Sequence, residues 1–591
     1  MKDHVVLKGG EFLIKDTPYA ENFIPEEINE DQKLIRNTVK NFVESEIRPL
    51  GSKLENQVEL LESAADLGLL GAHITEEYGG NPLDTYSNTV ILEELGGGDA
   101  SFNTSIAAHT GIGMLPIYYF GSHELKLKYL PSLCNGKLKA SYCLTEPSSG
   151  SDALSAKTKA ELNVEGTHYL INGQKMWITN AGFADIFIVF AQIDGTKFTG
   201  FLVERNIAGF TFGEEENKLG IKGSSTRQIF FDNVAVPKEN ILGEIGKGHL
   251  IAFNVLNIGR FKLGTMAMGG CKYSIDLAIK YANDRIQFDK KISEFGAIQY
   301  KLAEMIIRTF AIESTVYRVS DLIEEKITEA VEKGSAAHIA MLESAEEYAI
   351  ECAIIKVNGS EVLDFVIDEL LQIHGGYGYS EEYLPAKLYR DARINRIYEG
   401  TNEINRMLIV NMLLRRVMKG KLDLVGPAWE VQKELTGMPN SDMPDGSYAH
   451  EARSVKDMKK LCLMVAGAAV KYQMDGKHVL VDQQEILMNV ADMLIETFLC
   501  ESTLLRIQKL HEMLKPDQML EYDSILKVLI YDSQSRIAKA AMDGLASFAE
   551  GDELRIMMLG IKRFSRYEAI NVKSYRRNIA SKAISLNGYC Y

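Results

Sequence analysis

The chain is organised around a short break between two helical patterns, Tyr398-Glu399-Gly400-Thr401-Asn402-Glu403. A glycine directly after a carboxylate lets another molecule approach the backbone, because glycine has no Cβ and adopts φ > 0 freely. Burial of Glu399 in an apolar site would raise its pKa from about 4.3 toward neutrality, where a base for a C–H proton works best. Glu399 is therefore a candidate catalytic base. The competing interpretation is an ordinary helix start with Thr401 as its N-cap.

Long amphipathic patterns surround this break. Apolar residues recur at helical spacing over 298–327 and 337–373 upstream, and over 404–418 downstream. Long helices of this kind are typical of a bundle, which we place at 244–425.

Two more helical regions lie toward the ends of the chain. Residues 1–139 show helical spacing interrupted by glycine-rich breaks. Residues 426–449, with glycines and prolines at 437–446, are predicted to be a linker. Residues 450–591 then regain an amphipathic helical pattern and form a predicted C-terminal helical domain.

The period changes to that of strands between residues 140 and 243. The stretch 169–179 resembles a hairpin with Asn172-Gly173 as its turn, and 186–193, 198–204 and 229–236 are further β-rich runs. Strands this close together favour antiparallel pairing in a barrel or sandwich. The expected fold is therefore mainly α with a central antiparallel β-domain.

Composition restricts the class of function. The chain has 591 residues, and its net charge of −16 argues against nucleic acid as the main partner, because phosphate binding needs a basic face. The seven cysteines are scattered without a C-x-x-C pair, so neither a disulfide framework nor a zinc site is predicted. Residues 1–16 lack a signal- or transit-peptide pattern, and no apolar run is long enough to span a membrane. We therefore expect a cytoplasmic protein.

The order of several motifs carries a resemblance to a known family. From about residue 25 to 415 the chain resembles the acyl-CoA dehydrogenases, and its extra C-terminal domain makes it most similar to the very-long-chain, homodimeric branch. The resemblance implies a helical domain, a β-barrel-like domain and a helical bundle, with FAD between the last two. The motifs are Tyr142-Cys143-Leu144-Thr145-Glu146-Pro147 with Ser149-Gly150-Ser151-Asp152, Trp177-Ile178-Thr179, Arg285-Ile286-Gln287-Phe288, Gln372-Ile373-His374-Gly375-Gly376 and Tyr398-Glu399-Gly400-Thr401.

The resemblance also implies residue roles. Thr145 would bond to the flavin pyrimidine edge, while Trp177 and Thr179 would cover the flavin face remote from substrate. Arginine and glycines would hold the pyrophosphate and adenosine across a dimer interface. The complete implied cofactor set is Tyr142, Leu144, Thr145, Gly150, Ser151, Trp177, Thr179, Arg285, Phe288, Gln372, Gly375, Gly376, Thr401 and Glu403. The implied substrate contacts are Ser151, Arg260, Tyr398 and Gly400.

Some relatives instead take the base from the residue before a family arginine that matches Arg260. That residue is Gly259 here, so only Glu399 can serve. Arg260 would contact CoA or the catalytic loop, with a plain ion pair as the alternative.

The implied reaction is α,β-dehydrogenation of a saturated acyl-CoA to the trans-2-enoyl-CoA, as in fatty acid β-oxidation, with electrons passing to electron-transfer flavoprotein. No metal is required. Two alternatives remain: an acyl-CoA oxidase that uses oxygen, and a non-enzymatic relative that serves as an assembly or binding factor. Small residues at Thr104 and Ala108 would leave a deep acyl slot, which predicts long chains of about C12 to C18, each buried methylene adding up to ~0.8 kcal/mol.

The end of the chain is locally basic. This excess could place the domain at an anionic membrane surface as a peripheral contact. Alternatively, the basic residues pair with acidic neighbours in the catalytic domains. The residues concerned are Arg555, Lys562, Arg563, Arg566, Lys573, Arg576, Arg577 and Lys582, against Asp552, Glu553 and Glu568.

Overall fold

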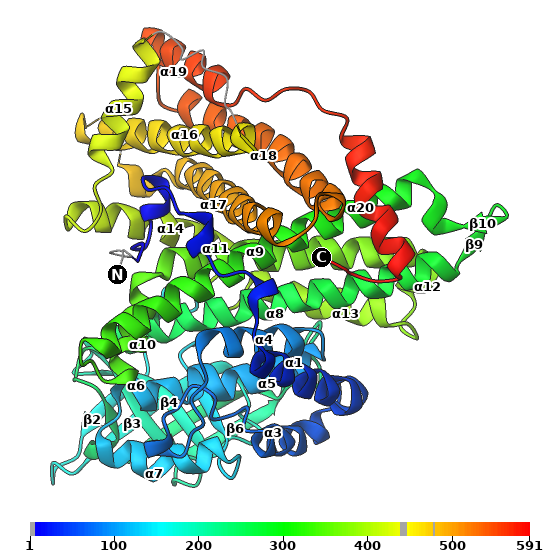
Figure 1. Cartoon of the computed structure of the whole chain (residues 1–591). Coiled ribbons are helices and arrows are strands. Elements are labelled where there is room, and N and C mark those ends of the chain that lie inside the picture. The colour runs from blue at the N-terminus through cyan, green and yellow to red at the C-terminus, as the bar shows by residue number, and fades with distance from the viewer. Residues whose placement is uncertain (1–5, 438–445, 477–478) are drawn as a thin grey trace.

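The computed structural model describes residues 6–437, 446–476 and 479–591. It is mainly helical with one β-domain, and in Figure 1 the N-terminal helices and the sheet lie at the bottom, the long central helices in the middle and the C-terminal helices at the top. The expected fold class is thus confirmed.

The N-terminal helices begin at side-chain caps. Asn29 and Gln32 form a reciprocal capping box at the start of α1, and Asp84 accepts from the Ser87 N–H at the start of α4. A π-helical turn, η7 (Ala108–Gly113), follows α5, and its Ala108 and Ile112 line the cavity described below. The helices are α1 (Glu30–Phe42), α2 (Arg48–Leu50), α3 (Gln57–Asp66), α4 (Thr85–Gly96), α5 (Ala100–Ala107), α6 (Leu115–Phe120) and α7 (His123–Cys134).

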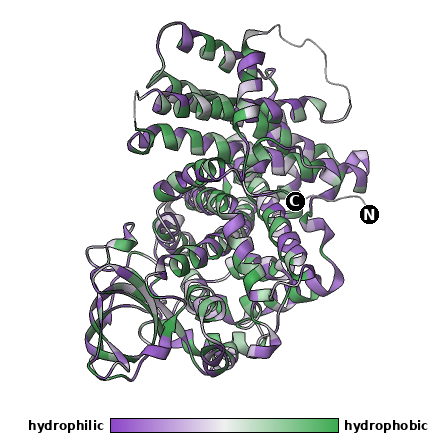
Figure 2. Cartoon of the chain, turned by 90° about the vertical axis from the view of Figure 1, so that its left-hand side faces the viewer, coloured by the Kyte–Doolittle hydropathy of each residue, from purple (hydrophilic) through white to green (hydrophobic). Residues whose placement is uncertain are grey.

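The β-domain is one eight-stranded sheet. Its path runs β6-β7-β3-β2-β4-β5-β8, with β1 attached to β4, and in Figure 2 the sheet is seen curled at one end of the molecule. Pairing is antiparallel as expected, except that β1 and β2 run parallel to β4. The strands are β1 (Ala140–Cys143), β2 (Lys159–Leu162), β3 (His168–Thr179), β4 (Ile186–Ile193), β5 (Lys197–Glu204), β6 (Phe210–Glu215), β7 (Thr226–Pro237) and β8 (Ile241–Leu242).

The predicted hairpin at Asn172-Gly173 is wrong. Both residues lie inside the continuous strand β3, which pairs with β7 along its length and shifts register beside Gly173. A Cβ on Gly173 would lie 2.8 Å from Thr158 Cα. Glycine is therefore needed here for the close approach of a neighbouring segment, as is common at a bulge, and not for a turn.

The central bundle carries the site. The pattern predicted as one helix over 337–373 forms two helices that meet at Tyr348, whose buried ring ends in a hydroxyl that donates to the Leu7 carbonyl. A two-stranded arm, β9 (Ile286–Gln287) and β10 (Lys290–Lys291), projects from it. The helices are α8 (Gly248–Asp284), α9 (Gly296–Glu332), α10 (Ala337–Glu347), α11 (Ala349–His374), α12 (Gly376–Tyr379), α13 (Leu384–Ala392) and α14 (Asn402–Met418).

Part of the predicted linker is helical, because 425–436 form α15 and α16 begins at Ala449, while 438–445 lie outside the described residues. The C-terminal helices share one hydrophobic core with the bundle. Buried ion pairs also join the two regions, Arg318 with Glu501 and Arg506 with Glu313. The helices are α15 (Val425–Thr436), α16 (Ala449–Met474), α17 (Gln484–Met513), α18 (Leu520–Ala546), α19 (Gly551–Phe564) and α20 (Val572–Leu586).

Candidate active site

The candidate base lies in a strained loop directly before α14. Glu399 has φ +59° and Gly400 has φ +80°, and a left-handed conformation costs a non-glycine residue about 1–3 kcal/mol. Thr401 accepts from the Ile404 N–H at 3.2 Å and so caps the helix, as the ordinary interpretation predicted. Helix cap and candidate base are therefore neighbours, and neither interpretation excludes the other.

The surroundings of Glu399 suit a base. Its side chain touches the cavity described below, but Oε2 is buried and has no hydrogen-bond partner. Burial raises the pKa of Glu399, while the charges of Arg260 and Lys356 oppose that rise. A Cβ on Gly259 would lie 2.7 Å from Oε2, so the glycine of α8 leaves room for the carboxylate.

Three side chains hold the carbonyls of this loop. Lys356 Nζ donates to the Gly400 carbonyl at 2.7 Å, and Asn405 Nδ2 donates to the carbonyls of Glu399, Gly400 and Thr401 at 3.3, 2.8 and 3.0 Å. Arg260 Nε donates to the Glu399 carbonyl at 3.3 Å, and its Nη1 to Asn257 Oδ1 at 2.6 Å. Arg260 therefore contacts the catalytic loop, one of the two roles predicted for it, and forms no ion pair among the described residues.

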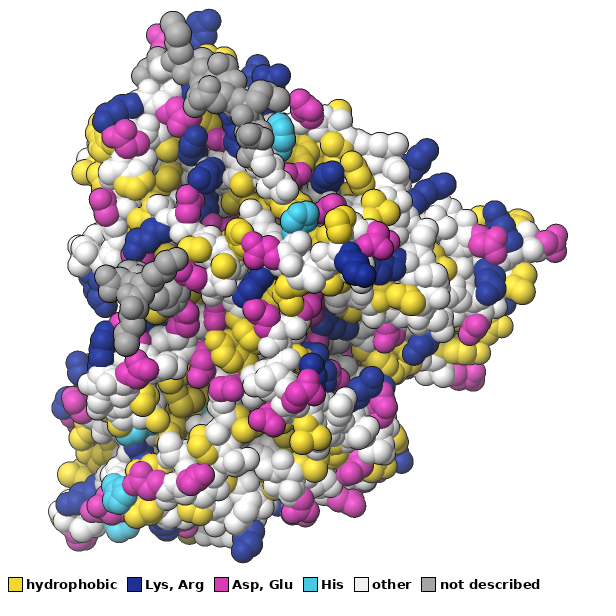
Figure 3. Space-filling model, in the orientation of Figure 1, with side chains coloured by type: hydrophobic (Ala, Val, Ile, Leu, Met, Phe, Trp, Pro, Cys, Tyr) yellow, Lys and Arg dark blue, Asp and Glu magenta, His cyan; other side chains and the backbone are white. Residues whose placement is uncertain are grey.

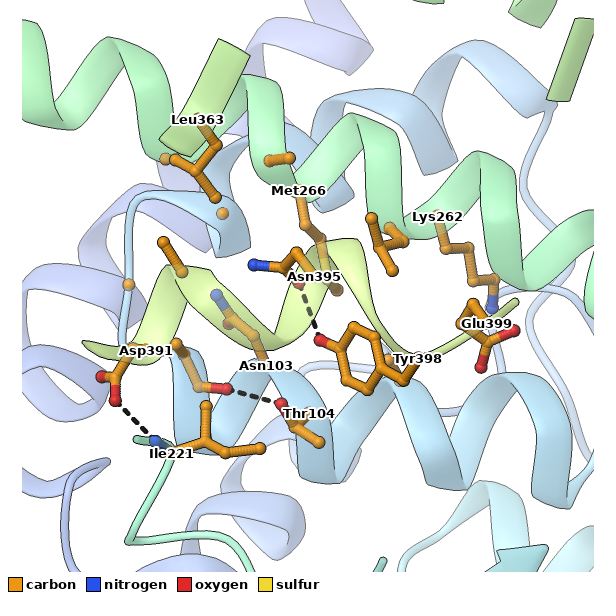
Figure 4. A pocket seen from close by; sticks show the side chains of 18 of the residues that line it. Asn103, Thr104, Ile221, Lys262, Met266, Leu363, Asp391, Asn395, Tyr398 and Glu399 are labelled. Atoms are coloured by element: carbon orange, nitrogen blue, oxygen red, sulfur yellow. Dashed lines mark hydrogen bonds between the residues drawn. The ribbon is translucent and has the colours of Figure 1, made fainter. Parts of the chain in front are cut away.

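A narrow, mainly apolar cavity extends from Glu399 (Figure 4). Along α8 it is bounded from Gly259 to Ser274, which are fifteen residues or roughly 22 Å apart at 1.5 Å per residue. Thr104 and Ala108, the two predicted slot residues, both line it. Tyr398 also lines it, and its hydroxyl donates to Asn395 Oδ1 at 2.8 Å.

The predicted flavin residues of the β-domain belong to β1, to the loop after it and to the end of β3. Thr179 lines the cavity together with Glu399. The Met176 N–H donates to the Thr145 carbonyl at 2.9 Å, which brings the loop after β1 against β3. Trp177 has φ +58° and is 61% exposed, unusual for a tryptophan on a strand.

The remaining residues predicted to contact the flavin lie in β1 and in the loop that follows it. Lys175 Nζ donates to the Leu144 carbonyl at 3.2 Å. Tyr142 is buried, its Oη has no partner, and burial together with the Glu399 charge raises its pKa. Gly150 and Ser151 are exposed, and nothing lies within 4 Å of a Cβ on Gly150.

A second pocket gathers the residues predicted for the pyrophosphate. Arg285, Gly375 and Gly376 line it, and Gln372 is adjacent through its carbonyl, which accepts the Gly375 N–H at 3.0 Å. A Cβ on either glycine would meet nothing within 4 Å. The Arg285 guanidinium lies over the Tyr377 ring, 5.6 Å from its centroid. Open glycine backbone beside a guanidinium suits a phosphate.

Three further residues predicted for FAD, Phe288, Thr401 and Glu403, do not line this pocket. Phe288, at the tip of the arm, is 89% exposed and lies outside the residues that line the pocket. Thr401 and Glu403 serve their own helix start: helix N–H groups and the Thr401 hydroxyl lower the pKa of Glu403. The open glycines and the arginine of the second pocket fit the pyrophosphate of a dinucleotide such as FAD.

Sequence reasoning missed four residues. Lys356 and Asn405 hold the base loop, and Asn103 lines the slot. Lys262 lines it too, and burial lowers its pKa to about 7. Lys356 and Lys262 fall inside helical patterns, where only their burial marks them, so no sequence signal could have found them.

Among the described residues, no cluster of three or more His, Cys, Asp or Glu side chains could hold a metal ion. No helix in the described ranges is long and apolar enough to cross a membrane.

Family models cover most of the chain. The N-terminal, middle and C-terminal domains of acyl-CoA dehydrogenase match 29–137, 141–234 and 246–414, and a further acyl-CoA dehydrogenase C-terminal domain matches 457–563.

Comparisons with individual proteins point to the same family. The chain is 43% identical to a probable acyl-CoA dehydrogenase of Bacillus subtilis over 99% of this chain and 98% of that one. It is 38% identical to the human very long-chain specific acyl-CoA dehydrogenase over 65% of this chain and 58% of that one. A crystal structure of an acyl-CoA dehydrogenase complexed with FAD from Bacillus anthracis matches with TM-score 0.95 and 44% identity, covering 99% of this chain and 100% of that one.

Fold and site together define a flavin-dependent oxidoreductase. The chain belongs to the acyl-CoA dehydrogenase family.

Proposed function

We propose that this protein oxidises long-chain saturated acyl-CoA to trans-2-enoyl-CoA, with Glu399 as the base. The observation that carries the proposal is the position of the Glu399 carboxylate, unpartnered at Oε2, at the head of a deep apolar slot. A base at the head of a slot of this shape would meet the carbon next to a thioester, with the tail extending inward.

The chemistry follows from the loop. No protein acceptor in the described residues takes the Glu399 backbone N–H, which leaves it free to bond the thioester carbonyl and stabilise the enolate charge as it forms. Glu399 Oε2 then accepts the α-proton, and its raised pKa helps it to hold that proton. Bound FAD supplies the acceptor for the hydride that leaves the β-carbon.

Slot length supports a long-chain substrate. An extended alkyl chain advances about 1.3 Å per carbon, from C–C bonds of about 1.5 Å, so roughly 22 Å along α8 accommodates about sixteen carbons. Between Lys262 and Tyr273, the α8 residues that line the slot are Leu263, Met266, Ala267 and Gly270, none of which is a bulky polar group.

A homodimer explains why the two pockets are separate. Gly259 lies in α8 and Arg285 directly follows the end of that helix, so the two are roughly 38 Å apart along its axis. About fourteen bonds link the two ring systems of FAD and span roughly 18 Å at about 1.3 Å each. One FAD cannot reach both pockets of one chain, so a second copy would supply the pyrophosphate pocket. Exposed aromatics beside that pocket, Tyr377, Tyr379 and Tyr383, suit such an interface.

We place the protein in the cytoplasm, a location supported by its free cysteines. The basic C-terminal residues already have partners in part. Arg576 pairs with Glu304 and Asp532, and Lys582 with Glu521. On the face in Figure 3, basic and acidic side chains are interspersed. Both observations favour intramolecular pairing over a membrane contact, which vesicle sedimentation would test.

The test is anaerobic titration of the purified yellow protein with acyl-CoAs of increasing chain length. Flavin bleaching should be fastest near C16, and a maximum at C4 to C6 would refute the long-chain proposal. Electron-transfer flavoprotein should reoxidise the reduced enzyme much faster than air does. Fast reoxidation by air alone would establish the oxidase instead.

A further inference from the structure

A continuous path of polar contacts leaves the base loop. Lys356 Nζ bonds both to the Gly400 carbonyl and to Asn402 Oδ1, each at 2.7 Å. Asn402 Nδ2 donates to Glu361 Oε1 at 3.0 Å. Glu361 in turn accepts from Arg406 at both carboxylate oxygens, at 2.7 and 3.0 Å. Each member is thus fixed by the next one along the path.

The path ends on the C-terminal domain. The third donor nitrogen of Arg406, Nε, bonds to Asp492 Oδ1 at 2.7 Å. Asp492 belongs to α17, which lies against α14 in Figure 1. The rigid guanidinium fork therefore engages Glu361 of the bundle on one edge and Asp492 of the added domain on the other.

The loop at the start of the path needs such support. The left-handed backbone at Glu399 persists only if surrounding contacts fix it, and the carboxylate must keep its place beside Gly259. Lys356 is buried, so its ammonium depends on the oxygens that it bonds. Hydrogen bonds in a chain with charged members strengthen one another, so the last contact affects the first.

We propose that the C-terminal domain positions the catalytic base, with Asp492 as the positioning residue that acts through Arg406, Glu361, Asn402 and Lys356. The inference rests on the proposed role of Glu399. Asp492 touches neither substrate nor cofactor, so it should affect the proton-transfer step and leave substrate binding alone. The added domain then has a catalytic purpose besides its share of the core.

The experiment uses the full-length FAD-loaded protein and measures flavin reduction in single turnovers. Asp492→Ala should lower the limiting reduction rate about threefold to thirtyfold, with the acyl-CoA dissociation constant unchanged within about twofold. FAD content and melting temperature should stay near those of the wild type, because the Asp492 side chain is 44% exposed.

A double-mutant cycle tests the route. Glu361→Ala alone should slow reduction similarly, and Asp492→Ala/Glu361→Ala should be no slower than the slower single variant, because both changes break the same path. The matched control is Arg576→Ala, which removes another ion pair between the C-terminal domain and the bundle, that with Glu304, away from this path. Its reduction rate should stay at the wild-type value.

A wild-type rate in Asp492→Ala, fully additive effects in the cycle, or an equal loss in Arg576→Ala would each overturn the inference. These results differ from failure of the proposed function. In that case acyl-CoA would not bleach the wild-type flavin, or Glu399→Gln would stay active.

Discussion

Glu399 Oε2 lies 2.7 Å from the point that a Cβ on Gly259 would occupy. The carboxylate of the loop therefore fills the space that a side chain at position 259 of α8 would need. A carboxylate could enter this space from the loop or from position 259 of α8, but the space does not hold both side chains. In this chain the loop places a carboxylate there, and α8 has a glycine opposite it.

Gly259→Ala should therefore displace the carboxylate. A contact of 2.7 Å forces one group to shift, and the Glu399 side chain is the part that can move, because hydrogen bonds hold the backbone of its loop. We expect flavin reduction to slow by about tenfold or more, equal to about 1.4 kcal/mol in the barrier, while FAD stays bound. Stopped-flow reduction measures this, with Gly467→Ala, a glycine of α16 outside the slot, as the control. An unaltered rate would show that the loop adapts freely.

Glu399→Gln should keep FAD but abolish bleaching by substrate. The amide has nearly the same shape, yet it cannot accept the α-proton. Turnover by acyl-CoA is the measurement. Activity above a few per cent of wild type would remove Glu399 from its assigned role.

Ala267→Leu should shorten the preferred substrate. Ala267 lines the slot eight residues beyond Gly259, or about 12 Å along α8, near the ninth carbon of an extended tail. We expect kcat/KM to fall more than about tenfold for C16 and to change little for C8, because three added carbons block the path. Ala278→Leu is the control, because it enlarges a buried side chain of the same helix outside the slot, and its chain-length profile should stay that of the wild type. An unchanged chain-length profile in Ala267→Leu would place the tail elsewhere.

Lys262 should make stability depend on pH. Burial lowers its pKa to about 7, whereas an unfolded lysine titrates near 10.4. Between these values the unfolded chain holds a proton that the folded chain has lost, so folding stability rises with pH, by up to about 1.4 kcal/mol per unit. Lys262→Met should lose this contribution and be more stable than wild type at neutral pH. Melting temperatures of both proteins at pH 7 and 9 test this, and parallel changes would contradict it.

Deleting 450–591 should prevent folding. The domain shares its core with α8, α9 and α11, and its loss would leave Arg318 and Glu313 of α9 without Glu501 and Arg506. Glu313 would still pair with Lys272, but the apolar faces that these helices now bury against the C-terminal domain would be exposed to water at about 25 cal/mol per Å². A domain is stable by only about 5–15 kcal/mol, so this exposure is enough to prevent folding. Circular dichroism of the purified fragment is the check. A folded, FAD-binding fragment would show that the domain is dispensable.

The sequence by itself determined the order of helical and β regions, because helical and strand periods are local signals. The carboxylate-glycine pair at Glu399 is a local signal too, and it gave the proposed base. The sequence also predicted Thr401 as a helix cap, which the structure confirms, and it singled out Gly375 and Gly376, whose backbone is open. The Asn172-Gly173 pair led to the wrong prediction of a hairpin turn. Turn propensity is local, and it cannot reveal that Thr158 of a neighbouring segment packs so closely that a Cβ on Gly173 would lie 2.8 Å from its Cα.

Only the tertiary structure decided which distant residues act together. Gly259 and Glu399 are 140 positions apart, and the Asp492 contact with Arg406 joins two domains. Lys262 and Lys356 read as ordinary helix residues until packing removes water from them, and that burial is what lowers the pKa of each. Such effects depend on distance and dielectric surroundings, which a linear pattern does not contain.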